Sequence, residues 1–498
     1  FGLITTTRIT QVFNRKVVQH HLDGAPPLSI VFAVPDHPWV DSADGAAVRV
    51  AMTVVCSGRR AGALVIATDD PSSGVTESGA VPISTRELVG VITSRLTVGA
   101  DLSAATSLQA NQSLCGQGVK LVGDGFLVNG HLGEEIMNPA SGASIVRRLV
   151  TPRDVLSGGA GRDVIDFFGL SAAEARLLHP AAYQQVVDLV RPLREQNKRK
   201  SIRELWWRFA WERPVLRQAL RDVSHYLVTL ETSKHRLFVP VPRSVLWDGS
   251  LFAIAVDRWA VLGVLSSRIH VGWALATGGR MGKGNDPRYN KTTGFEAFPF
   301  PLLDQPALQL ARFSEQLDAH RKRQQANHPG LTLTNMYNVL EKLRTGEALT
   351  PKEREVHEQG LVSVLAEIHD RLDEAVLAAY SWSDLAPALV GKPGGTTPNP
   401  DVSPEQAQAE EELLARLVAL NAERAEEERR RIVRWLRPEY QAPGAAAAEA
   451  GEQEDLDLDD APAAPPPPAA KQPWPSGLAA QANAVRDALA AEIGRAHV

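Results

Sequence analysis

The chain has 498 residues, enough for about three domains of about 150 residues each. Its 44% of hydrophobic and 22% of charged residues are ordinary values for a globular protein. No apolar run reaches the roughly 18 residues that cross a membrane, which excludes an integral membrane protein. The two cysteines, Cys56 and Cys115, exclude a disulfide scaffold and a four-cysteine zinc site, and they favour a cytoplasmic location.

The net charge of −5 is unevenly distributed along the chain. Residues 443–477 hold seven acidic residues and one basic residue, a balance of −6, so the remaining residues sum to +1. The acidity of the whole chain therefore does not argue against a nucleic-acid partner, and local patches must decide.

Residues 1–70 read as the closing strands of an α/β domain. Continuous apolar runs of this length are typical of a sheet that is buried on both faces. The strands are expected at 1–6, 28–34, 46–55 and 64–68, with a helix at 11–21. Residues 71–92, rich in Ser, Gly and Pro at their start, are predicted to be a linker.

Residues 93–303 read as a mixed α+β domain, and six of the ten tryptophans lie between Trp206 and Trp273. Short strands are expected at 119–122, 226–229, 236–239 and 251–256, and helices at 172–191 and 259–276. Residues 304–442 are predicted to be helical, because apolar residues such as Leu361, Leu365 and Leu372 recur on one helix face.

The chain ends in segments of unusual composition. Residues 443–477, rich in Ala, Pro and acids, are predicted to be a disordered linker. Residues 478–491 read as a short helix fragment, and residues 492–498 resemble a translated sequencing adapter rather than protein.

A basic segment with interleaved aromatic residues is the first candidate for nucleic-acid contact. Residues 191–221 contain ten basic and three acidic residues, with Trp206, Trp207, Phe209 and Trp211 among them. Clustered bases neutralise phosphates, and aromatic rings beside them can stack on bases. The alternative is a solvated basic helix with a tryptophan-anchored core. The expected DNA contacts in this segment are Arg199, Lys200 and Arg203.

Two further segments carry bases and fork-shaped polar groups. Lys234 and Arg236 lie at an expected turn between two strands. The Gly-rich loop after Gly278 (GGRMGKGNDPRYNK) allows its backbone to approach a polyanion closely. Guanidinium and amide groups can read guanine and adenine edges, although an ordinary surface loop would look similar. The expected DNA contacts in this loop are Arg280, Lys283, Arg288, Asn290 and Lys291.

The sequence carries none of the common catalytic signatures that we sought. It has no HExxH, no Walker loop and no G-x-S-x-G. Asp36 follows Pro35, but the acid-x-Lys pair that a metal nuclease needs is missing. The thirteen histidines show no metal-ligand spacing. No catalytic residue, cofactor-binding residue or metal ligand is therefore assigned in this chain.

Several motifs, in order, resemble the C-terminal part of class I adenine-N6 DNA methyltransferases of the large single-chain restriction–modification type. The likeness covers roughly residues 1–440, and Gly284–Lys291 (GNDPRYNK) is its most specific stretch. Thr7 and Arg8 replace the Asn-Ser pair that the family usually carries after its first strand. The matching segments are 1–11 (FGLITTTRITQ), 34–39 (VPDHPW), 47–52, 164–171 (VIDFFGLS), 231–236 (ETSKHR), 265–270, 284–291 and 298–301.

The resemblance implies a fold and a function. It implies an α/β remnant of a Rossmann-like methyltransferase domain, then a mixed α+β target recognition domain and a helical C-terminal region. It implies methyl transfer from S-adenosylmethionine to adenine N6 in double-stranded DNA, within a restriction–modification or phage-defence system. The family's Asn/Asp-Pro-Pro-aromatic motif and Phe-x-Gly-x-Gly loop are absent here. This portion alone is therefore expected to be inactive, with the cofactor held before Phe1.

Two other readings stay open at this point. One is a stand-alone DNA-specificity module without catalysis, and the other is a helical scaffold in which residues 304–440 dock a partner. The resemblance also leaves room for an upstream nuclease domain or a partner subunit.

Overall fold

A computed structural model describes residues 1–10, 12–39, 48–69, 83–128, 145–281, 286–303, 307–399 and 402–443. The chain divides into two compact units, Phe1–Ala446 and Ala447–Val498. All elements below belong to the first unit. The predicted linker at 443–477, the helix at 478–491 and the adapter-like end lie outside the described residues, apart from 443 itself.

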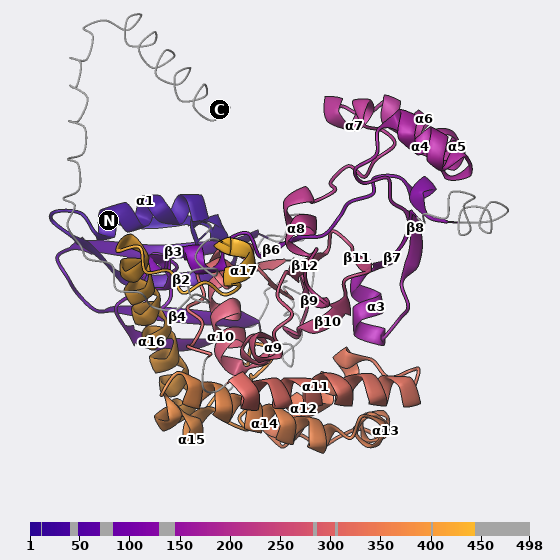
Figure 1. Ribbon diagram of the computed structural model, residues 1–498. Coiled ribbons are helices and arrows are strands. Elements are labelled where there is room, and N and C mark those ends of the chain that lie inside the picture. The colour runs from indigo at the N-terminus through magenta and orange to yellow at the C-terminus, as the bar shows by residue number, and fades with distance from the viewer. Residues whose placement is uncertain are drawn as a thin grey trace, which may run out of the picture. The chain divides into compact units, whose positions relative to one another are not determined.

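The N-terminal region forms a five-stranded sheet in the order β1-β3-β2-β4-β5 (Figure 1). Neighbouring strands are antiparallel except β2 and β4, which are parallel. The strands are β1 (Gly2–Thr6), β2 (Leu28–Trp39), β3 (Val48–Ser57), β4 (Gly62–Asp69) and β5 (Ile83–Gly90). The helical turn η1 (Thr7–Thr10) and helix α1 (Val12–Leu22) connect β1 to β2.

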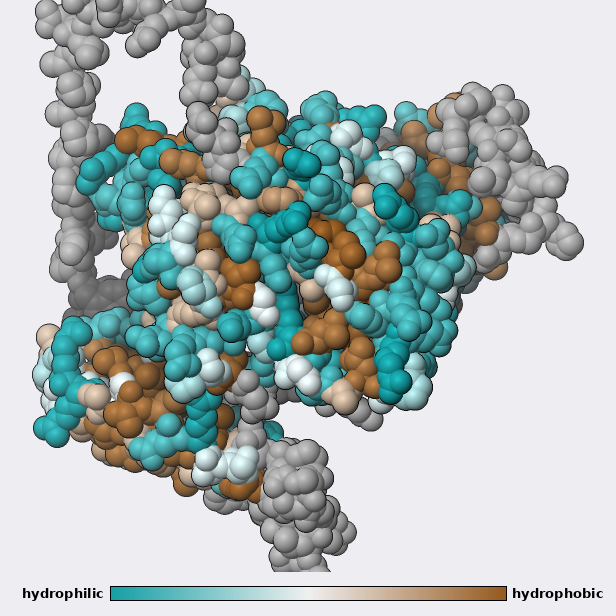
Figure 2. Space-filling model, turned by 90° about the horizontal axis from the view of Figure 1, so that it is seen from below, coloured by the Kyte–Doolittle hydropathy of each residue, from teal (hydrophilic) through white to brown (hydrophobic). Residues whose placement is uncertain are grey.

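Two expectations for this region are wrong. The predicted linker at 71–92 contains strand β5, which pairs with β4 from end to end. The sheet is also not buried on both faces. Ala33, Ala51 and Leu64 pack in a core on one face, whereas Ile4 and Val89 are 63% and 72% exposed. Figure 2 shows hydrophobic side chains gathered at the lower left, the side on which Figure 1 draws this sheet.

The middle region contains a four-stranded sheet, a three-stranded sheet and a hairpin. The four-stranded sheet has the order β10-β9-β12-β6, with β6 (Cys115–Gln117), β9 (His225–Leu230), β10 (Val239–Pro242) and β12 (Leu251–Ile254). The three-stranded sheet has β7 (Val146–Val150), β8 (Arg162–Ile165) and β11 (Val245–Trp247), and the hairpin has β13 (Gly279–Met281) and β14 (Asp286–Arg288).

The helices of this region are short. They are α3 (Pro152–Ser157), α4 (Ala172–Leu178), α5 (Pro180–Leu189), α6 (Arg191–Glu195), α7 (Lys200–Glu204), α8 (Pro214–Ala219), α9 (Trp259–Ser266) and α10 (Arg268–Thr277). The turns η2 (Leu102–Ala104), η3 (Gln109–Asn111) and η4 (Asp124–Phe126) and the π-helix η6 (Lys291–Glu296) complete the region.

The elements predicted here are mostly confirmed but broken or shifted. The predicted helix 172–191 is interrupted where Pro180, which lacks an N–H, starts a new helix. The predicted helix 259–276 is interrupted at Ser267, where the Asp373 carboxylate accepts from the N–H of Arg268 at 2.8 Å. Strand 119–122 is reduced to isolated bridges, because Val122 has a left-handed φ of 56°. Strand 236–239 is replaced by β10.

The C-terminal region is helical, as predicted. It contains α11 (Ala307–Asn327), α12 (Leu333–Thr345), α13 (Pro351–Gly360), α14 (Val362–Ala379), η7 (Ser383–Leu385), α15 (Ala386–Leu389), α16 (Pro404–Arg429) and α17 (Pro438–Gln441). Ser403 caps α16 by accepting from the N–H of Gln406. Leu365, Leu372 and Val376 of α14 share one core with the four-stranded sheet.

None of the described helices is by itself long and apolar enough to cross a membrane. Helices α9 and α10 pass that test only as a pair, bent by 58°. Most of their residues are buried in the core.

Candidate nucleic-acid interface

A cleft of about 990 Å³ brings two of the predicted contact segments together. One wall is built from α7, the turn that follows it and the start of α8. The other wall is built from residues 288–291 and Glu296, together with β6 and Phe252 of β12. The residues of the two walls lie far apart in the sequence, so no local sequence pattern predicts the cleft.

Trp211 is the central aromatic residue of the first wall. Its backbone exchanges hydrogen bonds with Lys120, at 3.2 and 3.3 Å. Its indole ring is contacted by two cations, with Lys120 Nζ 5.6 Å and Arg199 Cζ 5.1 Å from the ring centre. The ring is half-buried and lines the cleft. An indole that is held next to two positive charges is suited to stack on a base of a polyanion.

Arg213 lies beside Trp211 in an unusual backbone conformation. Its φ is +59°, in the left-handed region, and Pro214 follows it as the first residue of α8. The guanidinium Nε donates to the carbonyl of Gly118 at 2.8 Å. Partial burial lowers the pKa of Arg213. Burial raises the pKa of the neighbouring Glu212 carboxyl, and the positive charge of Arg208 acts in the opposite direction.

Arg288 is the principal cation of the second wall. Its Nη2 and Nε lie 2.6 and 3.0 Å from the same carboxylate oxygen of Glu231. Its side chain is 44% exposed. The backbone on either side is also fixed, because the N–H of Tyr289 donates to the carbonyl of Glu231 at 2.7 Å. The guanidinium is therefore exposed to solvent but held in one orientation.

Asn290 and Lys291, also predicted as DNA contacts, have partners within the protein. The Asn290 side-chain oxygen accepts from the N–H groups of Thr292 and Thr293, which makes it the cap of η6. Lys291 Nζ pairs with Glu296 at 3.0 Å and remains partly exposed. Asn290 is thus first a structural cap, a role that loop composition alone did not indicate.

The inner end of the cleft is formed by buried groups. Tyr289 is fully buried, and its hydroxyl lies 3.1 Å from Nε2 of His270. Burial raises the pKa of the Cys115 thiol, so this cysteine stays protonated and unreactive. Cys115 therefore serves as lining rather than as a nucleophile.

The predicted contacts of the basic segment lie at the surface. Arg199, Lys200 and Arg203 are exposed, next to the α7 wall. Lys200 pairs loosely with Glu204 at 3.6 Å. Arg203 also closes its own turn, by donating to the carbonyls of Asn197 and Lys198.

Only part of the basic segment lies at the surface. Arg194 is 1% exposed and donates to backbone carbonyls, among them those of Val122 and Trp206. Burial lowers the pKa of Arg194 to about 10. Arg217 is paired with Asp166 at 2.6 Å. Some bases of this segment therefore hold the fold and others face solvent, and DNA contact by the exposed ones stays a prediction.

The structure removes Arg236 from the predicted contacts. Its side chain is 2% exposed, and it donates to the Thr229 hydroxyl at 3.1 Å and to the Pro287 carbonyl at 3.0 Å. It also donates to the Leu230 carbonyl. Burial lowers the pKa of Arg236 to about 10. Arg236 organises the protein interior, and its neighbour Lys234 is exposed but donates to Asn338 Oδ1 at 2.7 Å.

The remaining predicted contacts cannot be placed. Lys283 and the side chain of Arg280 lie outside the described residues. Two cations, Arg213 in the cleft and Lys120 against the Trp211 ring, were missed as individual candidates. Arg213 was only counted within the basic segment, and Lys120 stands in no basic run. Among the described residues, no group of His, Cys, Asp or Glu is arranged to hold a metal ion.

The region that contains the cleft is similar to a known protein domain. Residues 106–302 match the family model of the MmeI target recognition domain, within the predicted domain 93–303. A comparison with curated protein sequences finds no match.

Two solved structures are similar to the chain. One is the type IIL restriction-modification enzyme MmeI in complex with DNA, with a TM-score of 0.59 and 18% identity. The match covers 85% of this chain and 50% of that one, so the chain spans about half of its length. The type IIG restriction endonuclease BpuSI matches at a TM-score of 0.27 and 11% identity, over 77% of this chain and 47% of that one, which is too low to carry an argument. The chain is therefore similar to the MmeI target recognition domain over residues 106–302, and its fold is similar to that of MmeI over most of its length.

Proposed function

We propose that this chain recognises a specific sequence in double-stranded DNA, and that the cleft between α7 and η6 is part of the contact surface. The observation that carries the proposal is that one cleft joins Trp211, with its two flanking cations, to the fixed guanidinium of Arg288. The match of this region to a target recognition domain, and the DNA-bound state of the similar MmeI structure, support it.

The residues divide into two kinds of DNA contact. The exposed bases Arg199, Lys200 and Lys291 would hold phosphates, which fixes the register without reading the sequence. Arg288, oriented by Glu231, would read a base edge in the major groove, where a guanidinium recognises guanine. Trp211 would stack on a base or sugar.

We further propose that the intact protein is an adenine-N6 DNA methyltransferase of a restriction–modification or phage-defence system. Its cofactor would be S-adenosylmethionine. Neither the Phe-x-Gly-x-Gly loop nor the Asn/Asp-Pro-Pro motif occurs in this sequence, so no residue here is assigned to the cofactor and no methyl-transfer step is derived. In this proposal β1–β5 are the closing strands of the methyltransferase domain, and the protein is cytoplasmic.

One alternative loses support from the packing of the helices. The apolar face of α14 packs into the core of the chain, where Leu365, Leu372 and Val376 are fully buried. This face of α14 is therefore not available to dock a partner, which weakens the reading of 304–440 as a docking scaffold. A stand-alone DNA-specificity module would share the cleft, and methyl transfer by the longer protein separates that reading from ours.

The test is the salt dependence of DNA binding by this chain. The logarithm of the binding constant should fall with the logarithm of salt concentration, with a slope of about −0.9 for each phosphate contacted. The double variant Arg199→Gln, Lys200→Gln should bind more weakly, with a slope that is shallower by about 2. Fluorescence anisotropy on a labelled duplex, between 50 and about 200 mM salt, measures both.

A matched control removes the same charge elsewhere. Arg429 and Arg430 are exposed bases at the end of α16, and each pairs with Glu426. The double variant Arg429→Gln, Arg430→Gln should bind DNA as the wild type does. Equal losses in the two double variants, or binding that does not respond to salt, would reject the cleft as the DNA-contact surface.

A further inference from the structure

The segment that holds Arg288 is itself held by a loop of the helical region. We call residues 231–236 the recognition loop and residues 391–399 the buttress loop. We propose that Asn338 and Thr396, in α12 and the buttress loop, are positioning residues that set the orientation of Arg288 in the cleft. The inference rests on the proposed function, and it extends DNA-sequence discrimination to residues outside the cleft.

The first step is the contact between the recognition loop and β14. The N–H of Ser233 donates to the Pro287 carbonyl at 3.3 Å, and Arg236 Nη2 donates to the same carbonyl at 3.0 Å. The carboxylate of Glu231 takes the guanidinium of Arg288. Both the backbone before Arg288 and its side chain therefore follow the recognition loop.

The second step is the contact between the recognition loop and the helical region. The N–H of Arg236 donates to the Thr396 carbonyl at 2.8 Å. Nδ1 of His235 lies 3.0 Å from the Thr396 hydroxyl, and Nε2 lies 2.9 Å from Asn338 Oδ1. Lys234 Nζ donates to the same Oδ1. His235 and Thr396 are both 2% exposed, so water cannot easily replace these bonds.

These bonds define the state of the imidazole. Lys234 has only donors, so the Asn338 atom that faces it must be the amide oxygen. That oxygen requires an N–H on Nε2 of His235. The Thr396 hydroxyl lies 3.0 Å from Nδ1 of the same ring and donates to the Glu341 carboxylate at 3.2 Å. Burial lowers the pKa of His235, which favours the neutral form. The link is therefore directional, and it depends on specific donors and acceptors.

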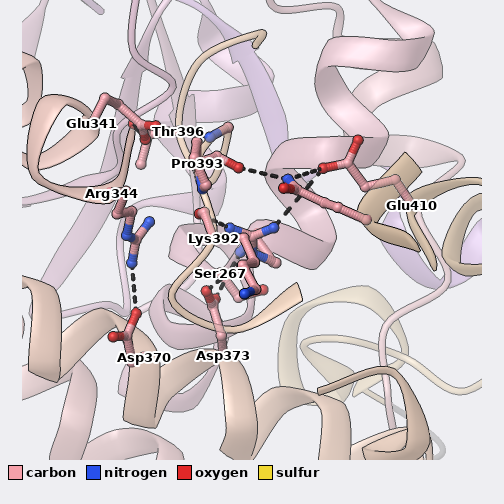
Figure 3. Close-up of polar contacts among 12 residues, drawn as sticks. Ser267, Glu341, Arg344, Asp370, Asp373, Lys392, Pro393, Thr396 and Glu410 are labelled. Atoms are coloured by element: carbon pink, nitrogen blue, oxygen red, sulfur yellow. Dashed lines mark hydrogen bonds and ion pairs between the residues drawn. The ribbon is translucent and has the colours of Figure 1, made fainter. Parts of the chain in front are cut away.

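The third step is the rigidity of the buttress loop. Figure 3 shows Lys392, Pro393 and Thr396 between Glu341 on one side and Glu410 on the other. The Glu341 carboxylate accepts from the N–H of Gly394 at 2.8 Å, and the Pro393 carbonyl accepts from Gln406 at 2.8 Å.

Two buried arginines complete the support of this loop. Arg268, paired with Asp373, donates to the Lys392 carbonyl. Arg344 pairs with Asp370 at 2.7 Å, as Figure 3 shows. A Cβ on Gly395 would lie 2.6 Å from Arg344 Nη1, so a larger residue there would require this guanidinium to shift. Among the described residues that line the cleft, neither Asn338 nor Thr396 appears.

The test uses paired substitutions in the whole chain. Thr396→Val and Asn338→Leu keep the side-chain size and remove the hydrogen bonds. Thr396→Ser keeps the hydroxyl and Asn338→Asp keeps the acceptor. Binding is measured on a duplex selected from a random library and on an unrelated duplex of equal length. We expect Thr396→Val and Asn338→Leu to lower the ratio of the two affinities about tenfold, and Thr396→Ser and Asn338→Asp to restore it.

A purely structural role would weaken binding to both duplexes alike and leave the ratio unchanged, which would overturn the inference. The melting temperature of each variant shows whether it is folded. If the wild type does not discriminate between the duplexes, the proposed function fails instead.

A second measurement does not depend on DNA. Hydrogen exchange of the peptide 286–290 should be faster in Thr396→Val and Asn338→Leu than in the wild type and the two conservative variants. Exchange in α11 should be unchanged and serves as the control. Unchanged exchange of 286–290 in folded Thr396→Val would show that the buttress loop does not hold Arg288, and would overturn the inference whatever the DNA result.

Discussion

Arg288 and Glu231 form an ion pair in which Nη2 and Nε of the guanidinium approach one carboxylate oxygen, at 2.6 and 3.0 Å. The two residues are 57 positions apart and meet because the segment after β9 lies against β14. A guanidinium that is fixed in this way loses little conformational entropy when it binds a base. The pair therefore gives the cleft a rigid donor group.

Replacing Arg288 should alter sequence discrimination. Arg288→Ala should weaken binding to the selected duplex by about 1–3 kcal/mol and relax the preference at one base pair. Arg288→Lys should not restore it, because an ammonium lacks the planar fork of the guanidinium. Anisotropy titrations on duplexes mutated one position at a time measure the effect. Lys200→Ala is the control, since losing a phosphate contact should weaken all duplexes equally. Unchanged discrimination in Arg288→Ala would remove Arg288 from the recognition set.

Trp211 should contribute affinity rather than discrimination. Trp211→Leu should weaken binding to every duplex by about 1–3 kcal/mol, because stacking tolerates any base. Trp211→Phe should retain part of that energy. The two backbone hydrogen bonds to Lys120 do not involve the indole, so both variants should keep this turn. Binding of Trp211→Leu with wild-type affinity would mean that the indole serves only as packing.

The fold was predictable where local sequence periodicity determines the secondary structure, and less so where contacts with distant residues determine it. The runs 1–6 and 226–229 became strands and the apolar face of 361–376 became α14, because these patterns are local. Strand β5 was missed because its partner β4, rather than its own polar sequence, gives it order. The break between α9 and α10 depends on Asp373, more than a hundred residues away.

The candidate site was predictable only in part, for the same reason. Basic composition found Arg199 and Arg288, yet it could not separate exposed bases from buried ones. Arg236 looked equivalent to Lys234, its near neighbour in the sequence, but the two point in opposite directions relative to the surface. Lys120 had no local signal at all, because only the fold brings it to Trp211.

The buried role of Arg236 predicts a stability effect. Arg236→Met should leave the carbonyls of Leu230 and Pro287 and the Thr229 hydroxyl without this donor. Each buried acceptor left unsatisfied costs about 1–3 kcal/mol, so the free energy of unfolding should fall by at least that much. Urea unfolding measures it. The exposed Arg199→Met should change stability by less than about 0.5 kcal/mol. Equal stability of the two variants would contradict the assignment of Arg236 to the interior.

Stability should also fall in acid because of buried histidines. Burial first, and then the positive charge of Arg236, lower the pKa of His270 to about 3. In the unfolded chain the pKa is about 6.5, so the unfolded state binds the extra proton between these values. The contribution of His270 is therefore fully present above about pH 6.5 and is lost as the pH falls from there towards 3. At pH 5 the loss is about 2 kcal/mol.

Urea unfolding across the range from about pH 5 to 8 checks this sign and separates His270 from the other groups. Burial lowers the pKa of His369 even below the usual range of histidine, so the wild-type slope contains at least two contributions. His270→Gln cannot titrate, and its free energy of unfolding should depend less steeply on pH than that of the wild type. The offset between the two curves reports the packing of the side chain against Phe298, whereas the slope reports only the proton. Identical slopes would mean that His270 is already free to ionise in the folded protein.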